Sequence, residues 1–200
     1  MGAKLVLEPV EDNPFLAAFY ADQERFAFPT QMFYLATRYA QQMDLHQPEL
    51  FQRLIVIDYL YAKDRLFAEL TLAAQELALY DRFAGLLAGN ITAPDFVLFL
   101  DAPTRVVMQR IQRRAIESEQ RIPPGYLEAL RERYYALWDR YDRSPVYVLE
   151  TTSIDYITDP AGKAWMLEMI RGLLDGKPIP GTPKPYRAGT GTQLGLFDKG

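Results

Sequence analysis

The sequence lacks cysteine and holds a single histidine among its 200 residues. The absence of cysteine excludes disulfide bonds, thiolate catalysis and zinc–sulfur sites, and it fits a reducing compartment. The single histidine, His46, follows a predicted helix and precedes Pro48. We assign it no role, because a loop position is the ordinary place for such a residue and a ligand role needs further donors.

Long apolar runs and an excess of basic charge are also missing. No charged leader precedes an apolar segment, and no uninterrupted stretch approaches the roughly 20 apolar residues of a membrane span. The formal net charge of −4 argues against a general nucleic-acid surface or an anionic-membrane surface. We therefore expect a cytoplasmic protein with no membrane partner and no direct nucleic-acid partner, in which any anion site is local.

Four short apolar stretches are typical of buried β-strands, and an acid follows each one. Continuous apolar strands imply cover on both faces, and the segments between them are long and helix-like. The pattern predicts an α/β fold in which helices cover both faces of a parallel sheet. Reactive groups gather at the carboxyl ends of parallel strands, so the first acid is well placed for chemistry. The strands and their acids are 5–7 before Glu8, 54–57 before Asp58, 96–100 before Asp101 and 146–149 before Glu150.

Helical spacing of apolar residues predicts the elements between the strands. Asn13 and Pro14 are a fair helix start, as a cap followed by proline in the first turn. Further helices are expected at about residues 28–43, 72–87, 104–114 and 126–141. Glycine, proline, threonine and lysine dominate from Asp175 onward. We therefore predict one domain over residues 1–175 and a flexible tail over residues 176–200.

An arginine-rich segment, RIQRRAIESEQRIP, occupies residues 110–123. Arginine binds phosphate oxygens with a fixed fork of donors and stays charged at any working pH. Such a segment makes a mobile lid over an anion. A solvated helix end with local ion pairs is an equally good interpretation of this segment by itself.

Four sequence blocks carry a resemblance to a known family. They are EPVEDNPF at 8–15, FYADQERFAFPTQMFYLATR at 19–38, DYLYAKDRLFA at 58–68 and SEQRIPPGYLEAL at 118–130. In this order and spacing they resemble the deoxynucleoside kinase family, particularly its bacterial purine-nucleoside branch, over about residues 5–170. The resemblance implies a P-loop kinase-like fold, nucleotide salvage, and transfer of the γ-phosphoryl group of ATP to the 5′-hydroxyl of a deoxynucleoside, with Mg²⁺.

The resemblance assigns the base and the nucleobase contacts. Glu8 is the expected general base, because a carboxylate beside the 5′-hydroxyl can accept its proton; a simple strand-end cap is the alternative. Gln31 matches a base-reading glutamine, whose amide both donates and accepts. Arg38 and Asp64 match a charged pair beyond it, and an acid there favours adenine, guanine or cytosine over thymine. An exposed helix face is the alternative for Gln31 and Arg38, which lie two turns apart.

The resemblance also assigns the sugar and phosphate contacts. Tyr20 and Glu119 match the pair that receives the 3′-hydroxyl and so positions the 5′ end for attack. Arg110 and Arg114 match lid arginines that contact ATP and neutralise the transferring phosphate. A third lid arginine of the family falls on Ile116 here.

Of the three residues after the second strand, two depart from the family pattern. The usual acid-Arg-Ser appears as Asp58, Tyr59 and Leu60. Asp58 is expected to help hold magnesium through water, together with Glu8, whereas the function of the arginine is lost or moved. The aromatic residues that could sandwich a base are each interpreted as core: Phe15, Phe28 and Phe67.

The phosphate-cradling GxxxxGK[ST] loop of the family has no counterpart in these 200 residues. That loop supplies backbone N–H groups, a lysine and a magnesium-binding hydroxyl, none of which Glu8 can replace. We therefore expect an N-terminally truncated kinase that lacks its first strand and binds ATP weakly. The alternative is a non-catalytic remnant that still binds nucleoside. A homodimer is expected from the resemblance alone.

The tail carries one further motif, QLGLF at Gln193–Phe197. It resembles the short peptide by which bacterial replication and repair proteins dock into the sliding clamp, where a hydrophobic plug on a tether suits groove binding. An idle tail end, or one that packs back on its own domain, is the other interpretation. A tail-tethered interaction protein is thus a second class of function.

Overall fold

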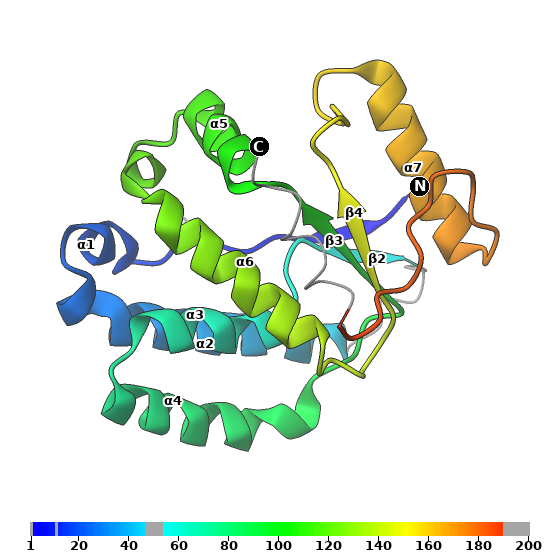
Figure 1. Ribbon diagram of the computed structural model, residues 1–200. Coiled ribbons are helices and arrows are strands. Elements are labelled where there is room, and N and C mark those ends of the chain that lie inside the picture. The colour runs from blue at the N-terminus through cyan, green and yellow to red at the C-terminus, as the bar shows by residue number, and fades with distance from the viewer. Residues whose placement is uncertain (1, 11, 47–53, 190–200) are drawn as a thin grey trace. The chain divides into compact units, whose positions relative to one another are not determined.

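The computed structural model of the chain describes residues 2–10, 12–46 and 54–189 (Figure 1). The chain divides into two compact units. The first holds residues 1–93 and 129–137, and the second holds residues 94–128 and 138–200. Helix α6, Pro124–Trp138, contributes residues to both. Each unit contains its own pair of parallel strands, which confirms the predicted α/β class.

The first unit begins with strand β1, Lys4–Val6, which pairs in parallel with β2, Ile55–Ile57. Leu5 lies opposite Val56 in this register. Both strands are short apolar segments, as the sequence predicts, and β-branched residues favour the extended backbone. Because the strands run in the same direction, their carboxyl ends meet at one edge.

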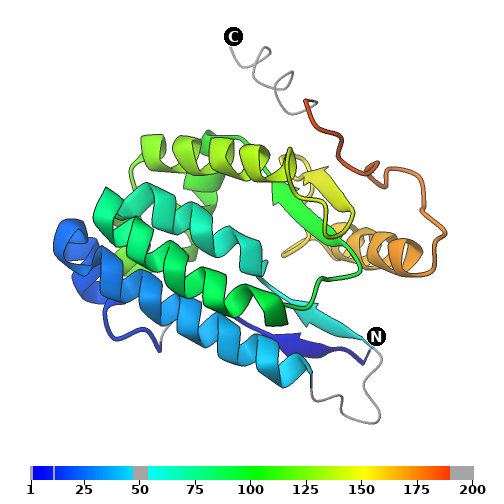
Figure 2. The ribbon, with the colours of Figure 1, turned by 90° about the horizontal axis from the view of Figure 1, so that it is seen from below.

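Helices make up the rest of the first unit. Three of them, α2, α3 and α4, lie side by side (Figures 1 and 2). Within the described residues, no helix is both long and apolar enough to cross a membrane. The helical elements of this unit are α1 (Leu16–Ala21), α2 (Gln23–Leu45), η1 (Tyr61–Lys63), α3 (Asp64–Thr71), α4 (Ala74–Leu87) and η2 (Ala88–Asn90).

Helix α2 begins earlier than the predicted start near residue 28. The side chain of Asp22 accepts a hydrogen bond from the backbone N–H of Arg25 at 3.2 Å and so caps the helix. Pro29 lies inside the helix. There it removes a single N–H donor, and the packing of the long helix outweighs that loss.

The core of the first unit forms where these three helices meet. Leu35, Ala68 and Tyr80 are each at most 1% exposed. Phe28 packs against them, as its interpretation as a core residue predicts. Burial of such side chains stabilises the fold by roughly 25 cal/mol for each Å² of apolar surface, so this cluster holds the elements that carry Gln31, Arg38 and Asp64.

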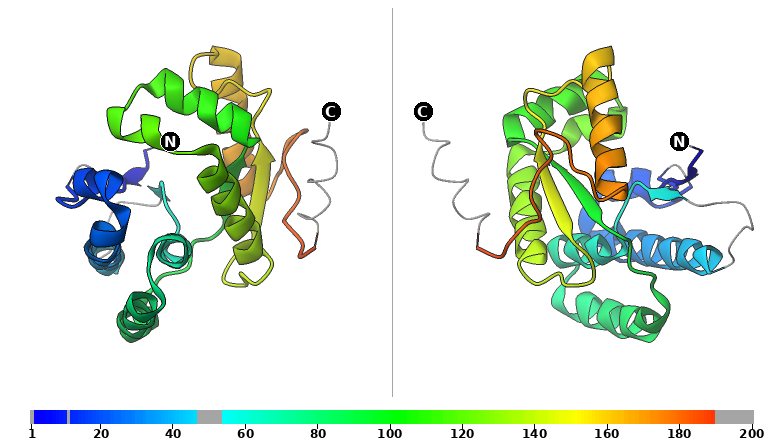
Figure 3. Two further views of the ribbon diagram at one scale, coloured as in Figure 1. Left: turned by 60° about the vertical axis from the view of Figure 1, so that its left-hand side comes forward. Right: turned by 90° about the vertical axis from the view of Figure 1, so that its right-hand side faces the viewer.

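The second unit contains strand β3, Val97–Asp101, paired in parallel with β4, Val146–Glu150. Leu149, Met166 and Met169 form its core, in which the last helix packs against the strands (Figure 3). The apolar runs that precede Asp101 and Glu150 therefore form strands, as predicted. The helical elements of this unit besides α6 are α5 (Thr104–Arg114), η3 (Glu117–Arg121) and α7 (Pro160–Leu174).

Residues 176–189 differ from the expected flexible tail. The backbone N–H of Tyr186 donates to the carbonyl of Val146 at 2.7 Å, and Pro185 forms an antiparallel bridge with Tyr147. This segment runs beside β4 (Figure 3). The apolar residue Ile179 packs on the core of the second unit, which local composition does not reveal. The clamp-like motif at 193–197 lies outside the described residues.

Candidate functional site

Two predicted acids meet at the carboxyl ends of β1 and β2. The backbone N–H of Glu8 donates to Oδ1 of Asp58 at 2.8 Å. Asp58 in turn donates its own N–H to the carbonyl of Val6 at 3.2 Å. The parallel register therefore brings together two residues that lie 50 positions apart in the sequence, at the edge where reactive groups of such sheets gather.

The carboxylate of Glu8 is held by two cations, one on each oxygen. Arg38 Nε donates to Oε1 at 2.7 Å, and Lys63 Nζ donates to Oε2 at 2.8 Å. Burial raises the pKa of Glu8, but the charges and hydrogen bonds of Arg38 and Lys63 together outweigh it and leave the pKa below its ordinary value. Glu8 is thus ionised at neutral pH, and its orientation is fixed.

Arg38 bridges Glu8 to Asp64. Its Nη1 pairs with Asp64, whose Oδ2 also accepts a hydrogen bond from the hydroxyl of Tyr80 at 2.6 Å. Arg38 is 3% exposed and Asp64 is 1% exposed, so the exposed-face alternative for Arg38 is wrong. The guanidinium also lies 4.9 Å from the ring centre of Tyr34. Buried charges of this kind persist only when they are paired and hydrogen-bonded, and this cluster meets that requirement.

Lys63 is the member of this cluster that sequence reasoning missed. Its ammonium faces Glu8 and lies over the rings of Tyr59 and Phe67, at 5.9 Å and 5.7 Å. Burial lowers the pKa of Lys63, and the charge of Glu8 opposes that shift. Lys63 lies beside Tyr59, the position at which the family resemblance places an arginine. The sequence feature that could have indicated this role is the position of Lys63, directly before the predicted site residue Asp64.

Gln31 lies on α2 and is 4% exposed, so it too is not on an exposed helix face. Its Nε2 donates to Oγ1 of Thr71 at 3.2 Å. Tyr20 lies on α1 with its ring edge-on to Phe19, at a centroid distance of 5.6 Å. The first unit therefore holds six of the predicted residues that resemblance assigned to nucleoside, base and metal: Glu8, Tyr20, Gln31, Arg38, Asp58 and Asp64.

The predicted lid residues belong to the second unit. Arg110 donates to the hydroxyl and to the carbonyl of Thr151, at 2.8 Å and 2.7 Å. Arg114 donates to one oxygen of Glu119 through two nitrogens, at 3.0 Å and 2.6 Å. The structure thus pairs a predicted phosphate ligand with a predicted sugar ligand. Both arginines are engaged by neighbours within their own unit.

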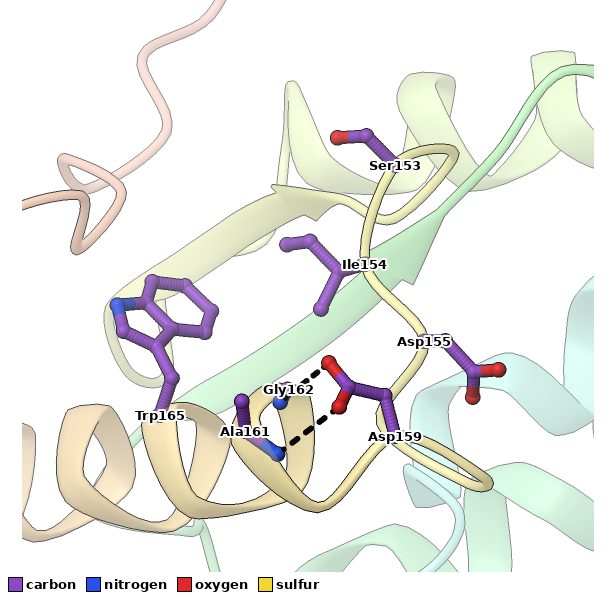
Figure 4. Close-up of a pocket in the computed structure, with 7 residues that line it drawn as sticks. All are labelled: Ser153, Ile154, Asp155, Asp159, Ala161, Gly162 and Trp165. Carbon is purple, nitrogen blue, oxygen red and sulfur yellow. Dashed lines mark hydrogen bonds between the residues drawn. The ribbon is translucent and has the colours of Figure 1, made fainter.

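A hollow of about 380 Å³ lies beyond the end of β4 in the second unit (Figure 4). Its two acids serve the local backbone. Asp159 accepts from the N–H groups of Ala161 and Gly162 and caps α7, and hydrogen bonds from Thr158 and Ile157 lower the pKa of Asp155 to about 2. The Asp155 carboxylate is directed away from the ring of Trp165. These contacts account for both acids without a ligand.

Asp58 has one carboxylate oxygen that is suitable as a magnesium ligand. Within the described ranges, no three acidic or histidine side chains gather into a metal site. Mg²⁺ commonly takes one or two carboxylates and completes its shell with water and substrate phosphates. Asp58 uses Oδ1 for the Glu8 amide, which leaves a second carboxylate oxygen for such a role. Both oxygens of Glu8 face cations, so Glu8 is poorly suited to ligate a metal directly.

Comparison with known proteins places this geometry in context. The sequence model of the deoxynucleoside kinase family matches residues 1–175. Deoxyguanosine kinase of Bacillus subtilis is 33% identical over 130 residues, which cover 64% of this chain and 63% of that protein. Deoxyguanosine kinase of Dictyostelium discoideum is 31% identical over 137 residues, which cover 65% of this chain and 48% of that protein. The chain therefore spans about half to two-thirds of the length of these curated relatives.

A solved structure resembles the fold. Deoxyadenosine kinase from M. mycoides, with the products dCMP and dCDP bound, matches with a TM-score of 0.72 at 23% identity, covering 88% of each chain. Structures described as that kinase with bound dCTP and with bound dATP match with TM-scores of 0.71 and 0.68. At this identity the likeness is one of fold.

Proposed function

The chain belongs to the deoxynucleoside kinase family, and from this premise we propose that it serves the transfer of the γ-phosphoryl group of ATP to the 5′-hydroxyl of a purine deoxynucleoside. The observation that carries the proposal is the carboxylate of Glu8, held at the end of β1 by Arg38 and Lys63. Relatives named as deoxyguanosine kinases support a purine substrate. Salvage of deoxynucleosides is the corresponding metabolic role.

Glu8 acts on the 5′-hydroxyl in this proposal. Its lowered pKa makes it a weak base, and phosphoryl transfer through a loose transition state needs little deprotonation of the nucleophile. The carboxylate therefore accepts a hydrogen bond from the hydroxyl, orients it, and takes its proton late. Gln31, Arg38 and Asp64 contact the nucleobase; Arg38 supports this role by pairing with both Glu8 and Asp64.

In this proposal, the lid residues exchange the Arg114–Glu119 ion pair and the hydrogen bonds from Arg110 to Thr151 for substrate contacts. Glu119 leaves Arg114 and accepts a hydrogen bond from the sugar 3′-hydroxyl. Arg114 and Arg110 then turn their donors toward phosphate oxygens, for which the guanidinium fork is suited. The exposed Arg114–Glu119 pair costs little to break, since surface ion pairs contribute only about 0–1 kcal/mol.

We propose that the phosphate donor is ATP, used together with magnesium. Structures of the M. mycoides kinase with dATP and dCTP support nucleotide binding, and magnesium, when bound, neutralises phosphate charge. Asp58 is the residue that would hold the ion. The 200 residues contain no GxxxxGK[ST] segment, so we expect a polypeptide of these residues to bind nucleoside but to transfer phosphate at a negligible rate.

Calorimetric titration with deoxynucleosides tests the proposal. We expect saturable binding of a purine deoxynucleoside and weaker binding of thymidine. Arg38→Met should abolish binding, because the nucleobase loses a donor and Glu8 loses a partner. Arg65→Met is the matched control, since Arg65 is exposed and pairs with Asp81 and Glu69 instead. Circular dichroism checks that both variants fold. The absence of saturable purine binding at millimolar concentration contradicts the proposal.

A homodimer through helix α4 is the assembly that we propose. Leu79, Phe83 and Leu86 are 42%, 44% and 80% exposed. Their spacing places them on one side of the helix, as residues three and four apart lie on the same face. Exposed apolar stripes of this kind mark protein interaction sites.

The clamp-like motif at Gln193–Phe197 supports a second role, in which the chain end docks into the groove of a sliding clamp. The support comes from the sequence alone, because these residues lie outside the described part of the chain. Titration of a labelled peptide of residues 190–200 with clamp protein tests it. Saturable binding in the micromolar range is expected, and no binding at high micromolar concentration contradicts it.

A further inference from the structure

We propose that Thr71 sets the base preference of this site by fixing the amide of Gln31, so that the site selects 6-oxopurines such as guanine over adenine. The inference rests on the proposed function, because it concerns the nucleobase that Gln31 contacts. Thr71 lies at the end of α3 and lies outside the set of residues that the family resemblance singles out. It is thus a specificity residue that acts through its neighbour.

Two hydrogen bonds determine which way the Gln31 amide points. The hydroxyl of Thr71 donates to the carbonyl of Phe67 at 2.7 Å. A hydroxyl has one hydrogen to donate, so the Thr71 oxygen can only accept from its other neighbour. The nitrogen of the Gln31 amide occupies that position at 3.2 Å. A flipped amide would bring two acceptor oxygens together, and this repulsion holds Gln31 in one orientation.

The fixed orientation leaves an acceptor without a partner. Gln31 Oε1 is buried and makes no hydrogen bond within the described residues. A buried acceptor in this state is costly, and the cost is recovered when a ligand supplies a donor. The remaining N–H of the same amide stays available as a donor. Gln31 therefore presents an acceptor and a donor in a fixed order.

This order distinguishes the two kinds of purine. Guanine carries a ring N1–H donor beside its O6 acceptor, whereas adenine carries a ring N1 acceptor beside its N6 amine donor. An amide that can turn over matches either edge. An amide held in one orientation matches only one of these two purine edges. The unpaired atom of Gln31, Oε1, is an acceptor, so it matches the ring N–H of a 6-oxopurine. Unpaired buried polar groups in the wrong complex produce strong discrimination.

A purely local role for Thr71 is the competing explanation. Threonine hydroxyls often bond to the carbonyl four residues earlier and bend a helix slightly. Thr37 makes the same bond on α2, to the carbonyl of Phe33 at 2.8 Å. It therefore provides a matched control that has the helix-bending bond but lacks the bond to Gln31.

The experiment measures the dissociation constants of deoxyguanosine, 2′-deoxyinosine and deoxyadenosine by calorimetry for the 200-residue chain. The unaltered chain is expected to bind both 6-oxopurine nucleosides at least about tenfold more tightly than deoxyadenosine, the equivalent of one good hydrogen bond. Thr71→Val should bring that ratio close to one, because the amide becomes free to turn over. Thr71→Ser and Thr37→Val should both retain the ratio.

Several results overturn the inference. An unchanged ratio in Thr71→Val overturns it, as does a preference of the unaltered chain for deoxyadenosine. Thr71→Ala serves as the second variant if Thr71→Val does not fold, as judged by circular dichroism. If all three nucleosides bind and the ratio of their dissociation constants is the same with and without Thr71, only this inference is contradicted. If none of them binds, the proposed function is contradicted as well.

Discussion

The ammonium of Lys63 lies 2.8 Å from Oε2 of Glu8, while Arg38 occupies the other oxygen of the same carboxylate. Both partners of this ion pair have side chains that are only 14% exposed, so water screens the interaction little. The pair joins the end of β1 to the turn before α3. These two cations favour the charged form of the carboxylate and fix its direction.

Replacement of Lys63 by methionine tests this relationship. The variant keeps an apolar stem of similar length and removes one of two cations. We expect the pKa of Glu8 to rise, because burial is then opposed by Arg38 alone. Carbon NMR of a carboxyl-labelled chain measures the titration directly. Lys63→Arg should preserve the low pKa, and an unchanged Glu8 pKa in Lys63→Met contradicts the assignment.

Glu8→Gln should change how stability depends on pH. The folded pKa of Glu8 lies below its ordinary value of 4.5, so the charged form stabilises the native state above that pH. This contribution is lost as pH falls through the folded pKa. We expect a cost of about 3 kcal/mol at neutral pH, because Lys63 is left buried and unpaired. The difference from the unaltered chain should shrink progressively as the pH falls below 4.5.

Urea unfolding at neutral pH and at a series of pH values below 4.5 measures this effect. Glu24→Gln is the matched control, since Glu24 lies exposed in the first turn of α2. It should change the free energy of unfolding by less than about 0.5 kcal/mol. A pH-independent difference between Glu8→Gln and the unaltered chain is inconsistent with a lowered Glu8 pKa.

Tyr80→Phe should weaken the support beneath Asp64. The Tyr80 hydroxyl donates to Asp64 at 2.6 Å, and the side chain is 1% exposed. Its removal leaves a buried carboxylate oxygen without that donor, at a cost of about 1–3 kcal/mol. Tyr39→Phe is the control, because its hydroxyl accepts an exposed hydrogen bond from Asn90 at 3.3 Å. Equal melting temperatures for the two variants would show that the buried bond contributes nothing.

Phe83→Glu should separate the proposed dimer. Light scattering of the unaltered chain is expected to give twice the chain mass of 23.0 kDa. A charge in the centre of the apolar stripe on α4 should return the mass to that of one chain, because an unpaired charge is costly to bury. Arg82→Glu, on the same helix, should leave the mass doubled. A monomeric unaltered chain rules out the α4 dimer.

Local sequence patterns were sufficient for the strands and for the residues at their ends. An apolar run followed by an acid is a signal within a few residues, so the positions of Glu8 and Asp58 could be predicted before any pairing was known. Helix α5 was found with the predicted bounds, Thr104–Arg114. Helices α3 and α7 were not predicted. Helix α3 has only eight residues, which are too few to show a clear helical spacing of apolar residues, and its sequence was already assigned to a binding motif.

Only the tertiary structure decided which side chains complete the site. Lys63 reaches Glu8 across 55 positions of sequence, and Gln31 reaches Thr71 across 40. No local periodicity reports such pairs, because they depend on how β1 and the helices that follow it pack. The same holds for residues 176–189, whose composition suggested a free tail but whose backbone bonds to β4. The sequence by itself determined the chemical groups, and long-range packing determined their partners.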